Sequence, residues 1–336
     1  MIVVVVPEPS AVWLPQLAAA AAGDEERVVL LALGGWRATL LRLAVRTWVR
    51  GAADRRIRAR LATRRLVDRW AAMRVPDAAT TIYAPSFAAR RTFAAAALRT
   101  GAVRCVLIED LPWLRELHDD LDRAAARHPD AHFLQRFRAP AHDLAHQEAE
   151  WVLAHEQLVF GSWALERRML AGVPPDRVAL WAWAAQSVAD RMSGRAGAGR
   201  RQGPASSGRV VLLLAGPGAA RGGLLEAVAA VSRIPGAELL VRGGEALEPR
   251  AVLDIPGVRT STEEERATLC RIDAVLAPGW CEAYPGEVVL AASLGIPVIA
   301  TTRAAGAVDV AACGTVVEPG DVEGLLAACR ALRRTS

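Results

Sequence analysis

The segment GWCEAYPGEVVLAASLGIPVIA, residues 279–300, holds the acidic side chains best placed for chemistry. Glu282 lies in a loop behind the apolar run 274–276, which predicts a buried strand. Because ligands of parallel sheets gather at the carboxyl ends of the strands, Glu282 should project into a ligand cleft and could accept hydrogen bonds from sugar hydroxyls. Glu287 opens the helix expected next, and a helix N-terminus favours an acid on electrostatic grounds alone.

A glycine-rich stretch, VVLLLAGPGAARGG at residues 210–223, predicts a strand, a turn and the start of a helix. Gly216 and Gly218 would let a ligand approach the backbone, and Arg221 would add a charged donor beside the free N–H groups of the helix. This geometry suits a diphosphate. Two alternatives stay open: a tight turn with a solvated arginine, and a nicotinamide dinucleotide site, although Arg221 stands where the third glycine of GxGxxG belongs.

Three residues of the first half could serve an acceptor. Glu109 and Asp110 follow the apolar run 104–108, so one of them could act as a base or orient a substrate. The alternative is that they cap the next helix. Trp113 could form the wall of an acceptor site, although tryptophan more often only packs.

The histidines and cysteines predict neither a metal site nor a disulfide framework. His142 and His146 have the i, i+4 spacing of metal ligands on a helix, but no third ligand is marked. The five cysteines form no CxxC pair and are odd in number, which fits a protein of the reducing cytoplasm. Prolines interrupt the apolar run of the opening MIVVVVPEPS, so it predicts a buried strand and not a signal peptide or a membrane span.

Positive charge is concentrated in the first part of the chain. Residues 1–200 hold 28 arginines against 21 acidic residues, whereas residues 201–336 hold 13 against 15. The segment Arg37–Arg74 alone has 12 arginines and two acids. It predicts a pair of amphipathic helices with solvated basic faces, or else a surface that docks on an anionic membrane or an anionic acceptor. No nucleic-acid-binding module accompanies the charge, so we expect no nucleic-acid partner.

Short β-branched runs alternate with Ala/Leu/Arg-rich segments of helical period, which predicts parallel sheets with crossover helices. Each half has six such runs, near residues 2–6, 27–33, 80–84, 104–108, 157–160 and 177–180, then 209–214, 238–241, 258–260, 274–276, 297–300 and 315–317. A Gly/Ser/Pro-rich stretch at 193–208 predicts a linker. The expected fold class is therefore α/β, with two doubly wound Rossmann-like domains, 1–192 and 209–336, and a ligand cleft between them.

The segment 279–300 resembles the family 4 glycosyltransferases of GT-B fold. Those enzymes carry a loop reading roughly E-G-Y-P-G, then E-A, then G-x-P-V-I-A. The residues that match this pattern are Glu282, Tyr284, Pro285, Gly286, Ala291, Gly295, Pro297, Val298, Ile299 and Ala300. Residues 161–181, Asp110–Pro112, Val308–Asp309 and 317–325 are similar to further segments of the family, so the resemblance covers most of the chain beyond residue 104.

The chain departs from the family at positions that concern the donor. Leu290 replaces the second glutamate of the pattern, which the family associates with the nucleotide ribose. Gly216 replaces the arginine and Arg221 the lysine of the family's diphosphate loop, and the loop after the first strand is PEPS, residues 7–10, in place of a glycine-rich one. Losing one charge-assisted hydrogen bond to a ribose would weaken binding by about ten- to a hundredfold.

The resemblance implies a glycosyltransferase that needs no metal and no cofactor. It implies the transfer, with retention of configuration, of a hexosyl group from a UDP-, GDP- or TDP-sugar to a small molecule, a glycan or a lipid-linked glycan. The site residues expected are Glu282, Asp110 and Glu109 for catalysis; Gly216, Gly218, Arg221, Glu282, Tyr284, Pro285, Gly286 and Glu287 for the donor; and Pro9, Ser10 and Trp113 for the acceptor. The alternative is a GT-B-like protein of reduced or no activity that serves as a binding or regulatory partner, which Leu290 favours.

Overall fold

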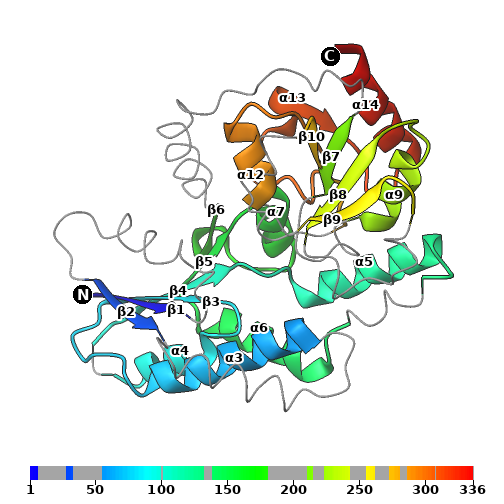
Figure 1. Ribbon diagram of the computed structural model, residues 1–336. Coiled ribbons are helices and arrows are strands. Elements are labelled where there is room, and N and C mark those ends of the chain that lie inside the picture. The colour runs from blue at the N-terminus through cyan, green and yellow to red at the C-terminus, as the bar shows by residue number, and fades with distance from the viewer. Residues whose placement is uncertain are drawn as a thin grey trace. The chain divides into compact units, whose positions relative to one another are not determined.

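The computed structural model describes residues 1–6, 28–32, 55–99, 101–131, 138–180, 210–214, 223–242, 255–261, 272–280, 286–306 and 308–335 (Figure 1). They fall into two compact units. The first unit comprises residues 1–114, 139–159 and 168–179, and the second comprises 115–138, 160–167 and 180–336. Each unit is built on one six-stranded sheet.

The sheet of the first unit has the strand order β2-β1-β3-β4-β5-β6. Its strands are β1 (Ile2–Val6), β2 (Val28–Ala32), β3 (Thr81–Pro85), β4 (Arg104–Glu109), β5 (Glu156–Val159) and β6 (Val178–Leu180). Strand β1, next to the edge strand β2, pairs in parallel with β2 on one side and with β3 on the other. Its IVVVV sequence has no polar alternation because a strand of a parallel sheet is buried on both faces.

Three helices cover one face of this sheet: α3 (Arg55–Ala72), α4 (Arg90–Ala97) and α6 (Ala141–Leu153). They lie side by side, with α4 in the middle (Figure 1). Alternate residues of the strands point at them, and with Val67 and Ala71 of α3 and Phe93 of α4 they form one apolar cluster. The strand residues in that cluster are Val3, Val5, Leu31, Ile82, Ala84, Cys105 and Leu107.

The sheet of the second unit has the order β12-β11-β10-β7-β8-β9. Its strands are β7 (Val211–Leu214), β8 (Glu238–Arg242), β9 (Val258–Ser261), β10 (Ala274–Ala277), β11 (Val298–Ala300) and β12 (Gly314–Val316). The pairings of β7, β8, β9, β10, β11 and β12 are all parallel. The strand order reverses next to β7 and β10, which in doubly wound sheets is where ligands bind.

The two faces of the second sheet carry separate apolar clusters. One joins the sheet to α9 (Leu224–Val231) and α14 (Val322–Thr335), and the other joins it to α12 (Gly286–Ser293) and α13 (Val310–Cys313). Leu212 and Leu213 are consecutive residues of β7 and belong to different clusters, as the pleat of a strand requires. The remaining helices are α5 (Leu114–Arg127), α7 (Ser162–Leu170) and the short 3₁₀ helix η2 (Pro175–Arg177).

These sheets confirm the predicted α/β class with two doubly wound halves. All twelve predicted strands are present, and their ends differ from the predicted ends by only one or two residues. The predicted linker 193–208 lies outside the described residues, so the domain boundaries and the cleft between the domains stay predictions. Among the described residues, no helix is long and apolar enough to cross a membrane.

Candidate functional site

Residues 278–280, which follow β10 and directly precede the segment of Glu282 in the sequence, form an anchor in the second unit, called here the β10 anchor. Pro278, Gly279 and Trp280 follow the strand and are buried. The hydroxyl of Thr301, just beyond β11, donates a hydrogen bond to the Gly279 carbonyl oxygen at 2.7 Å. This bond joins the ends of the neighbouring strands β10 and β11. On the β10 side it lies two residues before the segment 281–285.

Trp280 ties the same anchor to α9. Its indole N–H donates to Oε1 of Glu226 at 3.0 Å, and both side chains are buried. The Nε2 atom of His128 lies 3.2 Å from the same carboxylate oxygen. The guanidinium of Arg127 stacks over the Trp280 ring, 5.2 Å from its centroid, and donates to the Pro319 carbonyl oxygen. Glu226 is therefore a buried acid with a structural role, because it binds Trp280 of the anchor.

Gly223 sets the approach of α9 to the β10 anchor. It has a φ of +83° at the N-terminus of α9, and a Cβ built on it would lie 2.7 Å from the Pro278 carbonyl oxygen. Both the left-handed backbone and this contact require glycine. The start of α9, just after the predicted diphosphate loop in the sequence, is thus in close backbone contact with Pro278, just after β10.

Leu290 belongs to the core and not to the polar edge. It is 7% exposed and joins the apolar cluster between α12 and the sheet, with Leu213, Val275 and Val298. A carboxylate at this position would be buried among apolar groups, which is costly without a partner. Glu287 lies three residues earlier, in the first turn of α12, where it is half-buried.

A second charged cluster lies beyond β11 in the same unit. Arg303 donates to Oδ1 of Asp120 on α5 at 2.7 Å and stacks over the ring of Trp163, 5.4 Å from its centroid. Arg123 binds the same carboxylate oxygen. Burial raises the pKa of Asp120 to about 6, although Arg303 and Arg123 oppose the shift. This carboxyl titrates in the range where many acid–base groups work.

In the first unit, Asp110 follows β4 and is held by a buried arginine. Arg64 of α3 is fully buried and binds both carboxylate oxygens of Asp110, one of them at 2.8 Å. The same guanidinium donates to the Ser86 carbonyl oxygen at 2.9 Å. The pair is bidentate and lies at the carboxyl ends of β3 and β4, because Ser86 follows β3 and Asp110 follows β4.

Glu109 lies one residue earlier and is 2% exposed. The Ser86 hydroxyl donates to it at 3.0 Å, and a guanidinium nitrogen of Arg168 lies 3.5 Å from its Oε2. Burial raises the pKa of Glu109, while Arg168 and Ser86 lower it. Arg168 also stacks over the rings of Trp151 and Trp113, at 4.1 and 5.6 Å from their centroids. Trp113 therefore packs against an arginine that faces Glu109.

The structure describes five of the predicted site residues. Glu109 and Asp110 lie at the carboxyl end of β4, and Trp113 is joined to Glu109 through Arg168, which contacts both. Gly286 and Glu287 begin α12 in the second unit. The other predicted site residues lie outside the described residues; they are Pro9, Ser10, Gly216, Gly218, Arg221, Glu282, Tyr284 and Pro285.

Sequence reasoning missed the residues that support these sites. The sequence predicts solvated basic faces for residues 37–74, but Arg64 in this segment is fully buried. Its position on α3 three residues before Val67 and seven before Ala71, on the apolar stripe, was the available signal. Glu226 and Trp280 carry no local signal because they are distant in sequence and meet only in the folded unit.

Metal and disulfide sites were not expected. Within the described part of the chain, no three His, Cys, Asp or Glu side chains are grouped as a metal ion would require. His146 instead stacks on Phe87 with centroids 5.3 Å apart. Cys105, Cys313 and Cys329 are free thiols.

Comparisons with known proteins agree with this architecture. Residues 212–334 match the family model described as Glycosyl transferases group 1. None of the curated proteins matches the sequence. The match confirms the family resemblance over residues 212–334, the segment that contains Glu282.

Several solved structures share the fold at low sequence identity. Sucrose-phosphate synthase from Thermosynechococcus elongatus is 14% identical, with 98% of this chain and 89% of that chain covered and a TM-score of 0.55. The Anabaena protein HepE, solved with UDP-glucose, is 12% identical, with 98% and 88% covered and a TM-score of 0.55. WaaG, a glycosyltransferase involved in lipopolysaccharide biosynthesis, is 12% identical, with 99% and 90% covered and a TM-score of 0.52. These likenesses confirm the GT-B fold.

Proposed function

We propose that the chain is a glycosyltransferase that takes a sugar from a nucleotide-diphospho-sugar and passes it to an acceptor. The observation that carries the proposal is the match of residues 212–334 to the group 1 glycosyl transferases. The β10 anchor, which Glu226 and Thr301 hold by hydrogen bonds just before Glu282 in the sequence, also favours the proposal. That HepE was solved with UDP-glucose favours a nucleotide-sugar as donor. We infer a UDP-, GDP- or TDP-sugar, with no metal and no cofactor.

The donor site we propose is at the carboxyl edge of the second sheet. Gly216, Gly218 and Arg221 would hold the diphosphate, because a glycine-rich turn exposes backbone N–H groups at a helix N-terminus and an arginine adds charge. Glu282 would orient the sugar through its hydroxyls, beside Tyr284, Pro285 and Gly286. Donors fixed in place before the reaction stabilise the charge that develops on the departing diphosphate.

Glu287 is our proposed substitute for the missing second glutamate. It is half-buried, whereas Leu290 lies in the core, and both are on one helical face. A carboxylate at the start of α12 could reach the ribose from one turn earlier. If Glu287→Gln leaves the nucleotide affinity unchanged, Glu287 does not take the role of the missing second glutamate.

For the acceptor side we propose Pro9, Ser10 and Trp113, with Glu109 and Asp110 behind them. Arg64 binds both oxygens of Asp110, so we assign Asp110 to positioning the edge. Ser86 and Arg168 contact only Oε2 of Glu109, so we propose Glu109 as the residue that orients the acceptor or takes its proton. The acceptor class stays open among small molecules, glycans and lipid-linked glycans. Retention of configuration is part of the proposal.

A second candidate function is a GT-B-like binding or regulatory partner with little or no activity. The burial of Leu290 favours it, since that position cannot supply the carboxylate that the family uses. The chain would then keep the fold and part of the donor site without turnover.

Nucleotide release separates these two functions. Purified protein is incubated with a panel of UDP-, GDP- and TDP-sugars, with and without candidate acceptors, and free nucleotide is measured. We expect release with one nucleotide class, abolished in Glu282→Ala and retained in Glu318→Ala, which removes an exposed acid of the same unit. Binding without release would favour the regulatory partner, and no response across the panel would overturn the enzyme.

We also propose that the first unit meets an anionic membrane surface as a peripheral protein on the cytoplasmic side. The arginines of Arg37–Arg74 support this proposal by their number. Residues 37–54 lie outside the described residues, so the structural argument depends on α3 and its neighbours.

A further inference from the structure

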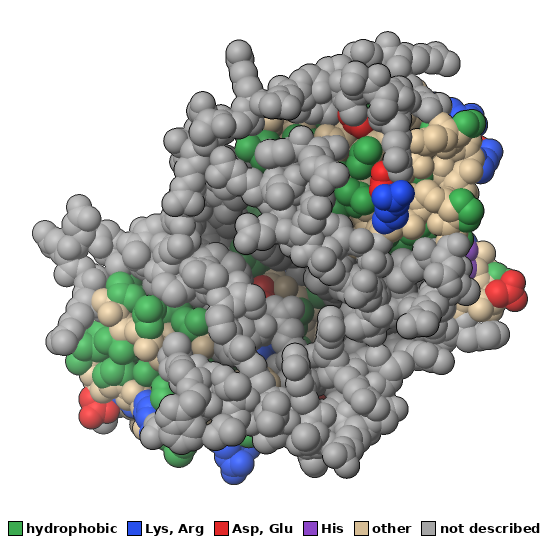
Figure 2. All heavy atoms as spheres, in the orientation of Figure 1, with side chains coloured by type: hydrophobic (Ala, Val, Ile, Leu, Met, Phe, Trp, Pro, Cys, Tyr) green, Lys and Arg blue, Asp and Glu red, His purple; other side chains and the backbone are tan. Residues whose placement is uncertain are grey.

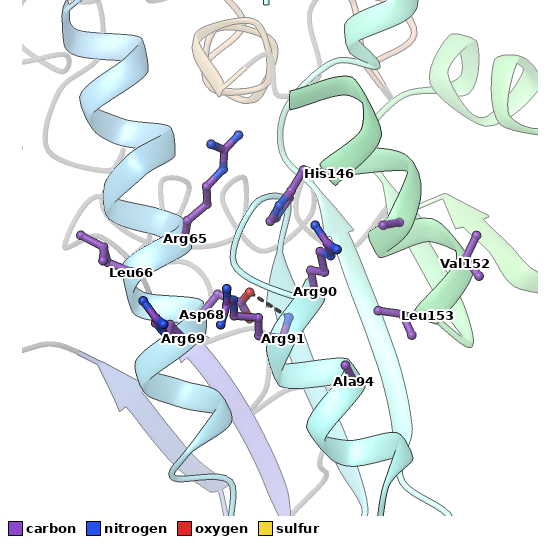
Figure 3. Close-up of a pocket in the computed structure, with 11 residues that line it drawn as sticks. Arg65, Leu66, Asp68, Arg69, Arg90, Arg91, Ala94, His146, Val152 and Leu153 are labelled. Atoms are coloured by element: carbon purple, nitrogen blue, oxygen red, sulfur yellow. Dashed lines mark hydrogen bonds between the residues drawn. The ribbon is translucent and has the colours of Figure 1, made fainter. Parts of the chain in front are cut away.

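A groove runs over the short helix α4, between α3 and α6, on the outer side of the first unit's helix layer. Its volume is about 750 Å³. Figure 3 shows that Arg65 and Arg69 come from α3, Arg90 and Arg91 from α4, and Val152 and Leu153 from α6. The helix in the middle has only eight residues, whereas α3 has 18 and α6 has 13, so the longer helices form the walls.

The acidic side chains near this groove are all engaged. Asp68 accepts hydrogen bonds from the backbone N–H groups of Arg91 and Thr92, at 2.8 and 2.9 Å. Glu150 accepts from the N–H groups of Phe87, Ala89 and Arg90, so two buried carboxylates close the N-terminus of α4. Because these N–H groups are occupied, an anion in the groove would have to bind to side chains.

Asp143 is the third acid and pairs with Arg65. Burial lowers the pKa of Arg65; Glu150 opposes this shift and the like charge of Arg90 adds to it. Among the described residues, Arg69, Arg90 and Arg91 form no side-chain ion pair. The groove therefore has an excess of positive charge that its own acids do not neutralise.

The groove also has an apolar rim. Leu66 is 38% exposed and Val152 is 79% exposed, and both line it. In the face drawn in Figure 2, hydrophobic side chains of the first unit lie at the surface beside arginines. A partner that suits both features carries a negative charge next to hydrocarbon.

We propose that this groove binds the phosphate group of an anionic phospholipid, with Arg69, Arg90 and Arg91 around the phosphate and Leu66 and Val152 against the lipid's apolar part. Guanidinium groups bind phosphate oxygens in pairs, and exposed apolar side chains add area that leaves water at the interface. The inference rests on the proposed membrane contact and not on glycosyl transfer. It places the membrane contact on the face formed by α3, α4 and α6. Two helices outside the Arg37–Arg74 segment, α4 and α6, then take part in that contact.

The test compares binding to vesicles of phosphatidylglycerol and of phosphatidylcholine by co-sedimentation. We expect the full chain to bind only the first, and more weakly as salt is raised. The double variant Arg90→Gln/Arg91→Gln should bind about thirtyfold more weakly, since each arginine at an anionic surface contributes a factor of about five. Both side chains are exposed, and Asp68 and Glu150 contact Arg91 and Arg90 through their backbone N–H groups, so the fold should survive. The thermal midpoint verifies this.

The matched control is Arg104→Gln/Arg330→Gln, which removes the same charge from exposed positions outside the groove. It should lose at most about fivefold. Val152→Ser should also weaken vesicle binding without changing the salt dependence. Equal losses in the two double variants would show that net charge acts and not the groove.

Two further outcomes overturn the proposal. If inorganic phosphate stabilises the wild type but not Arg90→Gln/Arg91→Gln while vesicles do not bind, the groove takes a soluble anion. If neither probe binds, both the groove and the membrane contact fail. Nucleotide release from donor sugars is measured separately, so that result leaves the proposed transferase standing.

Discussion

In the first unit, β4 ends at Glu109 and is followed by Asp110, and arginines from α7 and α3 contact these two carboxylates. In the second unit, β10 is followed by Pro278, Gly279 and Trp280, which carry no charge and are held by Glu226 and Thr301. The first strand end is a charged network of two carboxylates and two arginines. The second is an uncharged platform, residues 278–280, which directly precedes the segment of Glu282 in the sequence.

This difference teaches where recognition chemistry can be located. A buried carboxylate bound by an arginine on two oxygens has little capacity left for a ligand. An uncharged platform just before Glu282 in the sequence does not itself supply a partner for that acid, which is consistent with the donor site proposed in the second unit. The following changes test the two strand ends, from the largest expected effect to the smallest.

Arg64→Ala should destabilise the protein by about 3–5 kcal/mol, because it leaves Asp110 and the Ser86 carbonyl group buried without their shared donor. Urea unfolding at neutral pH measures the loss. Arg104→Ala is the control, since its pair with Glu156 is exposed and should contribute at most about 1 kcal/mol. Equal losses for the two variants would mean that the Arg64 network is not a closed structural unit.

Leu290→Ala should cost about 2–5 kcal/mol, because it opens a cavity in the apolar cluster between α12 and the sheet. Leu98→Ala, at a residue 88% exposed, should change the free energy of unfolding by less than about 0.5 kcal/mol. Leu290→Glu should also destabilise and should not increase nucleotide affinity. A gain in affinity with no loss of stability would show that this position belongs to the donor site after all.

Trp280→Phe should cost about 1.5–3 kcal/mol, because Glu226 loses a buried N–H donor. It should also reduce nucleotide-sugar affinity, since the loop of Glu282 starts at this residue. Calorimetric titration with the donor, next to Trp163→Phe as control, measures the second effect. Unchanged stability would mean that the His128 contact alone satisfies Glu226.

Asp120→Asn should alter how stability depends on pH. The pKa of Asp120 is about 6 in the folded chain and near 3.8 when unfolded, so the folded state binds the proton more tightly. Its contribution is therefore complete below pH about 3.8 and is lost as the pH rises through about 6. The wild type should lose stability relative to Asp120→Asn as the pH rises from about 4 to about 6, while Asp119→Asn, at an exposed neighbour, should follow the wild type. Parallel curves for all three proteins would contradict the shift.

The fold could be predicted almost completely from the sequence, because β-branched runs such as IVVVV and VLLL are dictated by burial on both faces of a parallel sheet. The location of Glu287 at the start of a helix followed from the same pattern. The pairing of Arg64 with Asp110 could not be predicted, since 46 residues separate them and a basic helix offers many arginines. Leu290 was recognised as a departure from the family, but its burial depends on how α12 is oriented on the sheet.

The most direct test of a donor site in the second unit is hydrogen–deuterium exchange with and without the nucleotide-sugar that the panel selects. We predict slower exchange in peptides covering residues 215–222 and 281–287, and unchanged exchange in those covering 104–114. Protection confined to the first unit, or no protection at a donor concentration that supports nucleotide release, would contradict this account.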